Sequence, residues 1–532
     1  MKTSDLFRKG KFLSLFFFLF LPLLLPGGGI ARIRILQTTD LHGQYSDGKE
    51  AVSAARLGTV IERLRREAGS SSTLYIDCGD LFQGTLESVR NGKGAHFARI
   101  LDLWGCDAFI PGNHDFDFGV PAFIRALQPF RGKILACNLS LEKKALPVLP
   151  WAIFQRDGVK IGVLGIAPRF MDQWFHPLLL EGANFDNRWN VFSSALSSLM
   201  RAKPHIIILA MHEGEYHSPR KEPGRTRKKE QYLSRIFREY PQILLVLGGH
   251  THQISSGKRI YRGQWYVQAP PHAKGVACID IQWNKKEKRL LSLQSKIVSS
   301  AGEKPHPPTA KLLFPAAGRV SRESRKAIGY FPRALAPLKR RETSNPLSRL
   351  FCQSMLEAVK ADIAFHGTLS DYFFRGGLIR ERHIFLLAPY ENPLVTIPLT
   401  KEECQRVLEE QFRSIRKGYF QDVRGLAYEM KEFQTGKRGK RRYIPFNPKT
   451  PLYTFSPSGR KILWQDGEKT VAFTAYALSG AGGRFPILRS IGQKKADRIT
   501  LHPVTIREAF RNYIIKHHPS RKYVPPQQKG KL

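Results

Sequence analysis

Five short apolar runs in this chain each end in side chains that commonly bind metal ions. The runs cover residues 33–36, 74–76, 108–110, 206–210 and 243–247, and they have the length and composition of buried strands. In an open α/β sheet, ligands bind in the crevice at the carboxyl ends of the strands. The residues that follow the runs are Asp40 and His42, Asp80, Asn113, His212, and His250 with His252. The pattern therefore predicts that these seven side chains meet at one edge of the fold.

The hydrophobic spacing between these runs becomes helical. Residues 51–68 and 191–202 carry apolar side chains every three to four positions, as one face of an amphipathic helix does. Strands that alternate with helices over residues 32–300 predict a layered α/β domain. Two later strands, at 265–268 and 276–282, are expected to complete a second sheet.

A second domain is predicted after a linker. Residues 301–342 are rich in Pro, Lys and Arg, which indicates a linker with a short helical piece. Asn345 and Pro346 suit the cap and first turn of a helix that runs to residue 359. Strands at 361–365 and 394–399 and a helix at 401–412 follow, so the second domain is assigned to residues 343–517. The length of 532 residues agrees with two large domains, and residues 518–532 form a basic tail.

The first 31 residues have the pattern of a secretory signal. Four basic residues among the first eleven precede an apolar run at 12–25, which three glycines at 27–29 interrupt. Cleavage is expected after Ala31. The run is shorter than the roughly 20 apolar residues of a membrane span, so no stable span is expected, and a retained N-terminal anchor is the alternative. The signal predicts export to the periplasm or the extracellular space.

The charge of the chain is strongly positive, with a formal net value of +41. Basic residues cluster at 220–229, 339–341, 437–442 and 516–531. A field of this sign attracts anionic substrates and polyanions. Two interpretations stay open: solvated loops, or contact with a polyanion or an anionic surface. The six cysteines show no paired spacing, and Cys78 is expected to be a buried strand-end residue rather than a metal ligand.

Aspartate, asparagine and histidine in this combination suit a pair of divalent ions. Ions of the Zn, Mn, Co and Fe group accept mixed imidazole and carboxylate ligands. Two such ions about 3.5–4 Å apart can stabilise both oxygens of an in-line displacement at phosphorus. Asp80 lies between Gly79 and Gly84 and is the expected bridge between the ions. We therefore predict two divalent ions and a metal-bound hydroxide as the nucleophile.

The segment Gly-Asn-His-Asp-Phe-Asp at residues 112–117 predicts the catalytic pair. Asn113 would offer its amide oxygen to one ion and lie next to the substrate. His114 would then face the phosphoryl group and stabilise the charge that develops on its oxygens. Asp117, three residues on, would hold the imidazole in one tautomer and favour its cationic form.

These five motifs resemble those of the calcineurin-like metallophosphoesterases. With its second domain, the chain resembles the exported bacterial 5′-nucleotidase and UDP-sugar hydrolase family. The resemblance implies an α/β fold, a four-layer αββα sandwich followed by a C-terminal α+β substrate-binding domain. It implies that one ion is bound by Asp40, His42, Asp80 and His252. It implies that the other ion is bound by Asp80, Asn113, His212 and His250.

The second domain contains looser versions of the family's substrate-binding landmarks. The resemblance implies that Phe420 and Tyr476 sandwich a base, with Leu478 a rival for the second position, and that Asn392 and Arg484 contact the substrate. Two stretches differ from the family. Arg484 stands where an acid usually holds the ribose, and residues 365–370 contain no arginine where the family has an Asn-Gly-Gly-Ile-Arg stretch.

The resemblance implies an exported metal-dependent phosphoric ester hydrolase, most specifically a 5′-nucleotidase of nucleotide catabolism that releases phosphate from nucleotides. Its substrate would be a nucleotide or another anionic small molecule. The altered pocket keeps open a hydrolase of the same fold that acts on a phosphodiester, a nucleotide sugar or a thiosulfate conjugate. A nucleotide-binding protein without turnover is the remaining alternative.

Overall fold

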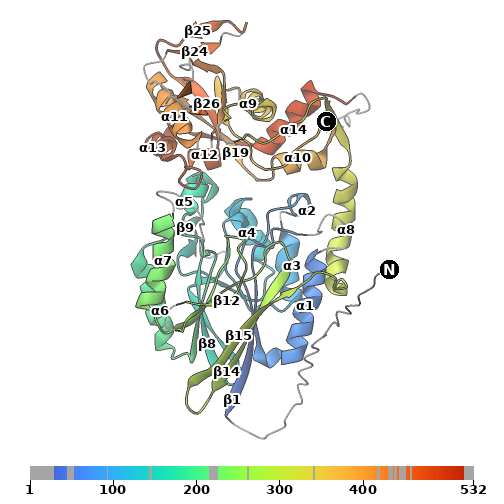
Figure 1. The fold of residues 1–532 in the computed structure, drawn as a ribbon, viewed down its shortest axis with the longest axis vertical. Helices are drawn as coiled ribbons and strands as arrows, with labels where there is room; N and C mark the ends of the chain where they lie inside the picture. The colour runs from blue at the N-terminus through green and yellow to red at the C-terminus, as the bar shows by residue number, and fades with distance from the viewer. Residues whose placement is uncertain are drawn as a thin grey trace, which may run out of the picture.

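The computed structural model describes residues 29–44, 53–92, 94–142, 146–214, 226–260, 263–339, 342–415, 420–428, 435–436, 440–441, 451–455 and 458–520. Two domains lie one above the other along the longest axis of the molecule (Figure 1). Residues 1–28 of the expected signal, most of the basic segments at 220–229 and 437–442, and most of the basic tail lie outside the described part of the chain.

Two sheets face each other in the N-terminal domain. The first has the order β15-β14-β1-β2-β3-β4-β6 and the second the order β12-β13-β11-β10-β8-β7. The strands of the first sheet are β1 (Ile30–Thr38), β2 (Thr73–Asp77), β3 (Ala108–Phe109), β4 (Lys133–Leu135), β6 (Val148–Leu149), β14 (Gly275–Asn284) and β15 (Arg289–Ser299). Those of the second are β7 (Trp151–Arg156), β8 (Val159–Ile166), β10 (Ile206–Met211), β11 (Ile243–Leu247), β12 (Ser255–Arg259) and β13 (Trp265–Gln268).

The strands that precede the polar motifs are parallel neighbours. β1 pairs with β2 and β2 with β3 in one sheet, and β10 pairs with β11 in the other. All five predicted strands are confirmed. The two later strands do not both join the second sheet, however, because β14 pairs antiparallel with β1 while β13 pairs with β11. Both sheets thus direct the carboxyl ends of their parallel strands toward the same end of the domain (Figure 1).

Helices cover the outer face of each sheet. An apolar layer between the sheets contains Ile33, Ile76, Val163 and Ile208. A second layer joins the first sheet to α1 (Ser53–Ala68), α3 (Ala95–Leu103) and α4 (Val120–Leu127). A third joins the second sheet to α6 (Trp189–Arg201) and α7 (Thr226–Glu239). The expected four-layer αββα sandwich is therefore confirmed.

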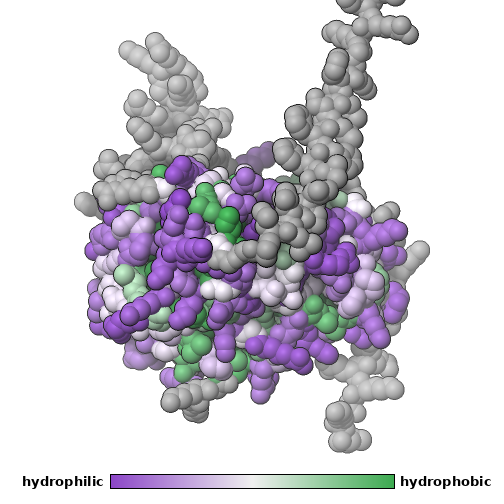
Figure 2. Space-filling model, turned by 90° about the horizontal axis from the view of Figure 1, so that it is seen from below, coloured by the Kyte–Doolittle hydropathy of each residue, from purple (hydrophilic) through white to green (hydrophobic). Residues whose placement is uncertain are grey.

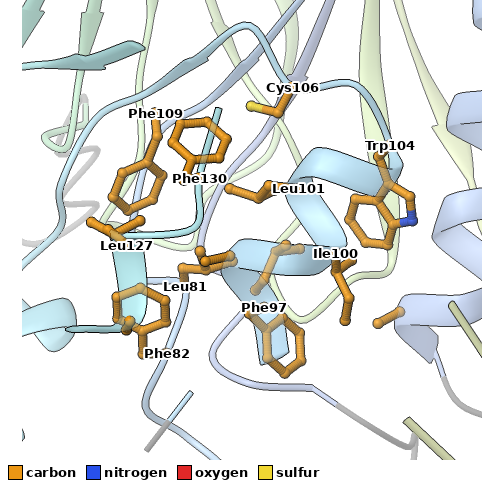
Figure 3. Packing of buried hydrophobic residues seen from close by; sticks show 14 of the residues in the cluster. Leu81, Phe82, Phe97, Ile100, Leu101, Trp104, Cys106, Phe109, Leu127 and Phe130 are labelled. Atoms are coloured by element: carbon orange, nitrogen blue, oxygen red, sulfur yellow. The ribbon is translucent and has the colours of Figure 1, made fainter. Parts of the chain in front are cut away.

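Large aromatic side chains fill the layer beneath the first sheet. Phe82, Phe97 and Phe109 are at most 1% exposed and pack among Leu81, Leu101, Leu127 and Phe130 (Figure 3). Leu81 and Phe82 directly follow Asp80 in the chain. Because interiors are packed to crystal-like density, this core fixes the backbone that carries the Asp80 side chain.

The segment expected to be a linker contains a long docked helix. Helix α8 (Pro307–Ser324) packs through Ala310, Leu313 and Ala316 on the core of the N-terminal domain. Strand β16 (Ala327–Phe331) then pairs with β18 (Gly377–Arg380) of the second domain. Only residues 325–326 separate the two elements. The connection is thus shorter than its proline content suggested, because Pro307 and Pro308 occupy the first turn, where proline is tolerated.

The C-terminal domain is a five-stranded sheet covered on both faces. Its order is β20-β17-β26-β19-β27. The strands are β17 (Ile363–His366), β19 (Pro393–Leu399), β20 (Asp422–Arg424), β26 (Lys469–Thr474) and β27 (Thr500–Thr505). One face packs on α9 (Pro346–Val359), α10 (Glu381–Leu387) and α14 (Ile506–His517). The other packs on α11 (Lys401–Ser414), α12 (Ala475–Leu478) and α13 (Pro486–Lys494).

The expected start of α9 is also present. The Asn345 side chain accepts a hydrogen bond from the Ser348 backbone, which completes a capping box ahead of Pro346.

The remaining elements are short. Within the described residues they are α2 (Leu86–Arg90), α5 (Met171–Trp174), β5 (Leu139–Leu141), β9 (Ala183–Phe185), β21 (Leu426–Tyr428), β22 (Thr435–Gly436), β23 (Lys440–Arg441), β24 (Leu452–Phe455), β25 (Lys461–Leu463), and the 3-10 turns η1 (Ser70–Ser72), η2 (His114–Phe116), η4 (Pro177–Leu179) and η6 (Ala496–Arg498).

Three further expectations concern the signal cleavage site, membrane spans and the cysteines. Ala31, the expected last residue of the signal, is fully buried in β1 opposite Trp283, so cleavage after it would remove the start of a paired strand. Among the described residues, none of the helices combines the length and the apolar content needed to cross a membrane. All six cysteines are free, and Cys78 is buried at the end of β2.

Candidate metal centre

The predicted convergence of strand-end side chains is present in the structure. Two groups of possible ligand atoms form, each within 4.8 Å of one another: Asp40 with His42 and His252, and Asp80 with His212 and His250. The residues come from the exits of β1, β2, β10 and β11. Asp40 and His42 fall in the same group, whereas His250 and His252 fall in different groups.

Asp80, a member of the second group, also lies close to the first. Its Oδ2 is 3.1 Å from His212 Nε2 and 3.8 Å from His42 Nε2. On the Asp40 side, His252 Nε2 is 3.3 Å from Asp40 Oδ1 and 2.9 Å from His42 Nε2. A carboxylate in this position can contribute one oxygen to a cation in either group.

The two buried imidazoles have Nε2 close to Asp80 and Nδ1 bonded to the backbone. His42 Nδ1 donates to the carbonyl oxygen of Gln83, and His212 Nδ1 donates to that of Cys78. Because a carbonyl only accepts, Nδ1 carries the proton of the neutral ring and Nε2 has the lone pair. His212 Nε2 is fully buried and makes no hydrogen bond. Backbone-anchored imidazoles of this kind are typical of metal-binding histidines.

The electrostatics also suit cations. Burial lowers the pKa of His42 to about 4, which keeps its ring neutral. Burial lowers the pKa of His212 as well, but the carboxylates of Asp80 and Asp40 raise it to about 10. Without a metal ion, His212 therefore holds a proton on Nε2 next to Asp80, and a cation bound there would replace that proton. The residues therefore fit a pair of divalent ions on chemical grounds.

The backbone at these positions adopts a rarely populated conformation. Five of the seven predicted ligands have φ between 49° and 70°, in the left-handed region: Asp40, His42, Asp80, His250 and His252. Such conformations cost about 1–3 kcal/mol each and concentrate at functional sites. The two glycines near Asp80 are required by close approach, because a Cβ on Gly112 would lie 2.3 Å from the Asp80 backbone nitrogen, and one on Gly79 would lie 2.4 Å from that of Gly112.

The segment at 112–117 positions the predicted catalytic pair beside Asp80. His114 Nδ1 is 2.9 Å from Asp117 Oδ2, and the His114 backbone N–H donates to Asp80 Oδ1 at 2.7 Å. Asn113 Oδ1 lies 2.9 Å from His250 Nδ1. Burial lowers the pKa of His114, but the Asp117 and Asp80 carboxylates raise it to about 9. The ring is therefore cationic at neutral pH.

Asp115 links the loop that carries Asp80 to the segment at 112–117 through hydrogen bonds. Its buried carboxylate accepts backbone N–H groups from Asp80 (3.0 Å), Leu81 (2.7 Å), Phe82 (3.2 Å) and Gly112 (2.7 Å). Burial, followed by the charge of Asp80, raises the pKa of Asp115 to about 7. This residue fixes the distance between the Asp80 loop and the Asn113–His114 turn.

Replacing Asp115 with alanine is expected to lower the free energy of unfolding by about 3 kcal/mol or more. The change leaves four buried N–H groups without an acceptor, and each unsatisfied group costs about 1–3 kcal/mol. Chemical denaturation of purified wild type and variant measures the difference. Asp102→Ala is the matched control, because Asp102 accepts a single backbone N–H, from Arg131 at the surface. Equal losses for both variants would contradict the clamping role of Asp115.

The second domain contributes a loop that lies over the catalytic pair. The Tyr390 ring is stacked on the His114 ring, with centroids 5.7 Å apart and planes at 17°. Gln83 of the first domain donates from Nε2 to the Pro389 carbonyl at 2.6 Å. Arg507 donates to the carbonyls of Ala388 (2.7 Å) and Pro389 (2.6 Å) and forms an ion pair with Glu391.

The residues expected to bind the substrate differ in their burial and in their contacts. Phe420 is only 5% exposed and packs edge-on against Phe412 in the core of the second domain, so it has little free surface for stacking. Tyr476 lies half-buried in α12. The Asn392 backbone N–H donates to the Tyr390 carbonyl, and the Asn392 carbonyl accepts from the Ile506 N–H, so the backbone that carries its side chain is fixed. Arg484 is half-buried. Burial raises the pKa of Tyr390, and the positive charge of Arg484 opposes this rise.

Three residues beside the site were not predicted. Tyr390 and Trp174 lie against His114 and His250, and His272 lies against the rings of His42 and His252 at 5.3 and 5.1 Å. The His272 backbone N–H also donates to the Asp40 carbonyl. The sequence feature that could have indicated His272 is its position shortly after strand β13, which follows the His250 and His252 pair. Tyr390 reaches the site only through packing between the two domains, whereas Trp174 contacts His250 from α5 of the first domain.

Two family models match the chain. Residues 33–254 match the calcineurin-like phosphoesterase model, and residues 325–490 match the 5′-nucleotidase, C-terminal domain. Protein UshA of Escherichia coli is 24% identical over 287 residues, which cover 49% of this chain and 51% of that protein. Protein UshA of Yersinia enterocolitica is 24% identical over 418 residues, which cover 71% and 75%. The alignment with the Escherichia coli protein thus spans about half of its length.

A solved structure has the same fold over nearly the whole chain. A putative 5′-nucleotidase from Staphylococcus aureus, crystallised with alpha-ketoglutarate, aligns with a TM-score of 0.69. The alignment covers 92% of this chain and 98% of that chain at 15% sequence identity. At this identity the likeness shows a shared two-domain architecture.

Proposed function

The chain belongs to the family in which a calcineurin-like metallophosphoesterase domain precedes a 5′-nucleotidase C-terminal domain, and from this premise we propose that it is a metal-dependent 5′-nucleotidase. One observation supports this most strongly. Two groups of ligand atoms lie side by side with Asp80 between them, next to the His114–Asp117 pair and beneath the second domain. The reaction would release phosphate from a nucleotide and leave a nucleoside.

We propose that the first group and Asp80 bind one divalent ion and that Asp80, Asn113, His212 and His250 bind the other. Such ions lower the pKa of a coordinated water and offset charge on phosphoryl oxygens. The metal is proposed to be Zn, Mn, Co or Fe, because the ligands mix imidazole nitrogen with carboxylate oxygen.

The catalytic work of the chain's own side chains would fall on His114 and Asp117. A cationic His114 ring can donate from Nε2 to a phosphoryl or leaving-group oxygen, because Nδ1 is held by Asp117. The bond from the His114 backbone to Asp80 keeps the ring at a fixed distance from the ligand groups. Preorganised donors of this kind stabilise a transition state without reorganising during the reaction.

The proposal is tested with the full-length purified protein. Metal is removed with a chelator, and Mn, Zn or Co is added back. Hydrolysis is then measured as phosphate release for AMP, as sulfate release for a thiosulfate conjugate, and by chromatography of the products for a nucleotide sugar, a cyclic nucleotide and a phosphodiester. We expect AMP to be hydrolysed only after metal is restored. If AMP is inert while a diester, a sugar nucleotide or a thiosulfate conjugate turns over, the nucleotidase proposal is wrong and the same-fold alternative holds.

We also propose that the protein is exported and that its basic surface contacts an anionic partner. The end of the N-terminal domain far from the second domain is mainly hydrophilic (Figure 2). The formal charge of +41 supports attraction to anionic surfaces. N-terminal sequencing of the secreted protein tests export. Elution from a heparin column only at raised salt tests the anionic partner.

A further inference from the structure

Two aromatic rings, one from each domain, lie against the residues that face the proposed phosphoryl position. Tyr390 of the second domain stacks on His114 at 5.7 Å. Trp174 of the first domain lies on His250 at 4.9 Å, with the ring planes at 36°. His114 directly follows Asn113, and His250 is bonded to the Asn113 side chain. Each ring therefore contacts a neighbour of Asn113.

The Tyr390 ring is held by the loop that carries it. Arg507 binds the Ala388 and Pro389 carbonyls, and Gln83 binds the Pro389 carbonyl from the opposite domain. Despite these contacts, Tyr390 is 40% exposed. A ring that is fixed in position but partly exposed can contact a ligand with little loss of side-chain entropy.

The Trp174 ring is held by a glycine turn of the second domain. A Cβ on Gly482 would lie 2.9 Å from Trp174 Nε1 and 3.8 Å from the Tyr476 hydroxyl. The Gly482 N–H donates to the Gln173 carbonyl at 2.8 Å. An ion pair between Arg489 of α13 and Asp172 of α5 also joins the two domains here. The turn at Gly482 therefore brings α5 and α12 together around Trp174.

The position of these rings differs from that of Phe420. Phe420 is buried in the core against Phe412, whereas Tyr390 and Trp174 contact histidines of the site itself. A group bonded directly to a phosphoryl at the ligand cluster would thus meet these two rings before any ring of the second domain's core.

We propose that Tyr390 and Trp174 are specificity-determining residues that contact the leaving group of a phosphomonoester and favour a cyclic leaving group, a nucleoside or an aryl ring, over an open chain. This inference rests on the proposed function, because it requires the phosphoryl group to bind at the ligand cluster. Flat and cyclic groups stack on aromatic faces, and such contacts contribute roughly tenfold or more in affinity. Open-chain groups gain less from the same surface.

The test compares each variant with wild type on three monoesters. Phenyl phosphate and AMP have cyclic leaving groups, and glycerol 3-phosphate has an open-chain one. Tyr390→Ala and Trp174→Ala are expected to lower kcat/KM for the cyclic substrates about tenfold, mainly through KM, and to change it less than about twofold for glycerol 3-phosphate. Tyr390→Phe should retain most of the wild-type preference. Tyr330→Ala, at an exposed tyrosine of β16, is the control and should behave as wild type.

A binding measurement makes the test independent of turnover. Quenching of intrinsic fluorescence is titrated with phenylphosphonate and with ethylphosphonate, which cannot be hydrolysed. We expect wild type to bind the phenyl compound more tightly, and Trp174→Ala and Tyr390→Ala to lose that preference. Equal effects on cyclic and open-chain compounds, or none on either, would overturn the inference. Failure of wild type to hydrolyse AMP would overturn only the nucleotidase proposal, because phenyl compounds still test the two rings.

Discussion

Replacing His114 with alanine is expected to lower kcat for phosphate release by about 100- to 1000-fold. The reason is that an oriented donor to the developing charge contributes an effect of this size in a site that excludes water. His114 is bonded to Asp117 and to Asp80, so its ring cannot be replaced by a nearby side chain without rearrangement. Steady-state kinetics with AMP at saturating metal measure the loss.

Two controls separate a catalytic role from a structural one. His114 is not a member of either group of possible ligand atoms, so His114→Ala should bind as much metal as wild type by elemental analysis. His205→Ala removes a histidine whose ring accepts a hydrogen bond from the Lys160 backbone at a partly exposed position, and it should change kcat less than twofold. Unchanged turnover in His114→Ala would refute the assigned role. Loss of metal would point instead to a structural role.

The first domain could be predicted from its sequence because several physical signals agree there. Each ligand loop follows an uninterrupted apolar strand, and parallel strands must end at the same side of their sheet. Buried polar residues at strand ends need partners, which metal ions can supply. Asp80, His212 and their partners could therefore be brought together without knowledge of the pairing order.

The second domain and its contacts were harder to predict because they depend on packing between segments far apart in sequence. Residues 301–342 contain many prolines, yet α8 forms because two of them stand in its first turn and its apolar face meets the first domain. Phe420 has the sequence neighbourhood of a ligand-stacking ring, but its burial against Phe412 follows from the three-dimensional core. Tyr390 approaches the site only because the domains associate, and no local pattern encodes that.

Replacing Asp80 with asparagine is expected to lower kcat/KM at least 1000-fold and to weaken metal binding. Asparagine keeps the size of the side chain, and its Oδ1 can still accept the His114 N–H. The Nδ2 group, however, takes the position of Oδ2, which lies 3.1 Å from His212 Nε2 and 3.8 Å from His42 Nε2. An NH₂ group donates and does not bind a cation, so the proposed bridge between the two groups is lost. A 1000-fold effect corresponds to about 4 kcal/mol of transition-state stabilisation.

Thermal unfolding distinguishes loss of metal from loss of fold in this variant. A ligand that binds only the folded state stabilises it, by about 2.7 kcal/mol at 100 times its Kd, so adding Mn or Zn should raise the Tm of metal-free wild type. The shift should be much smaller for Asp80→Asn, while the metal-free Tm changes little. Asp280→Asn, which alters a partly exposed carboxylate paired with Arg34, should keep the full metal-dependent shift. If Asp80→Asn binds two ions per chain and retains more than a tenth of wild-type activity, Asp80 does not bridge the centre, and the ligands must divide between the ions without a shared carboxylate.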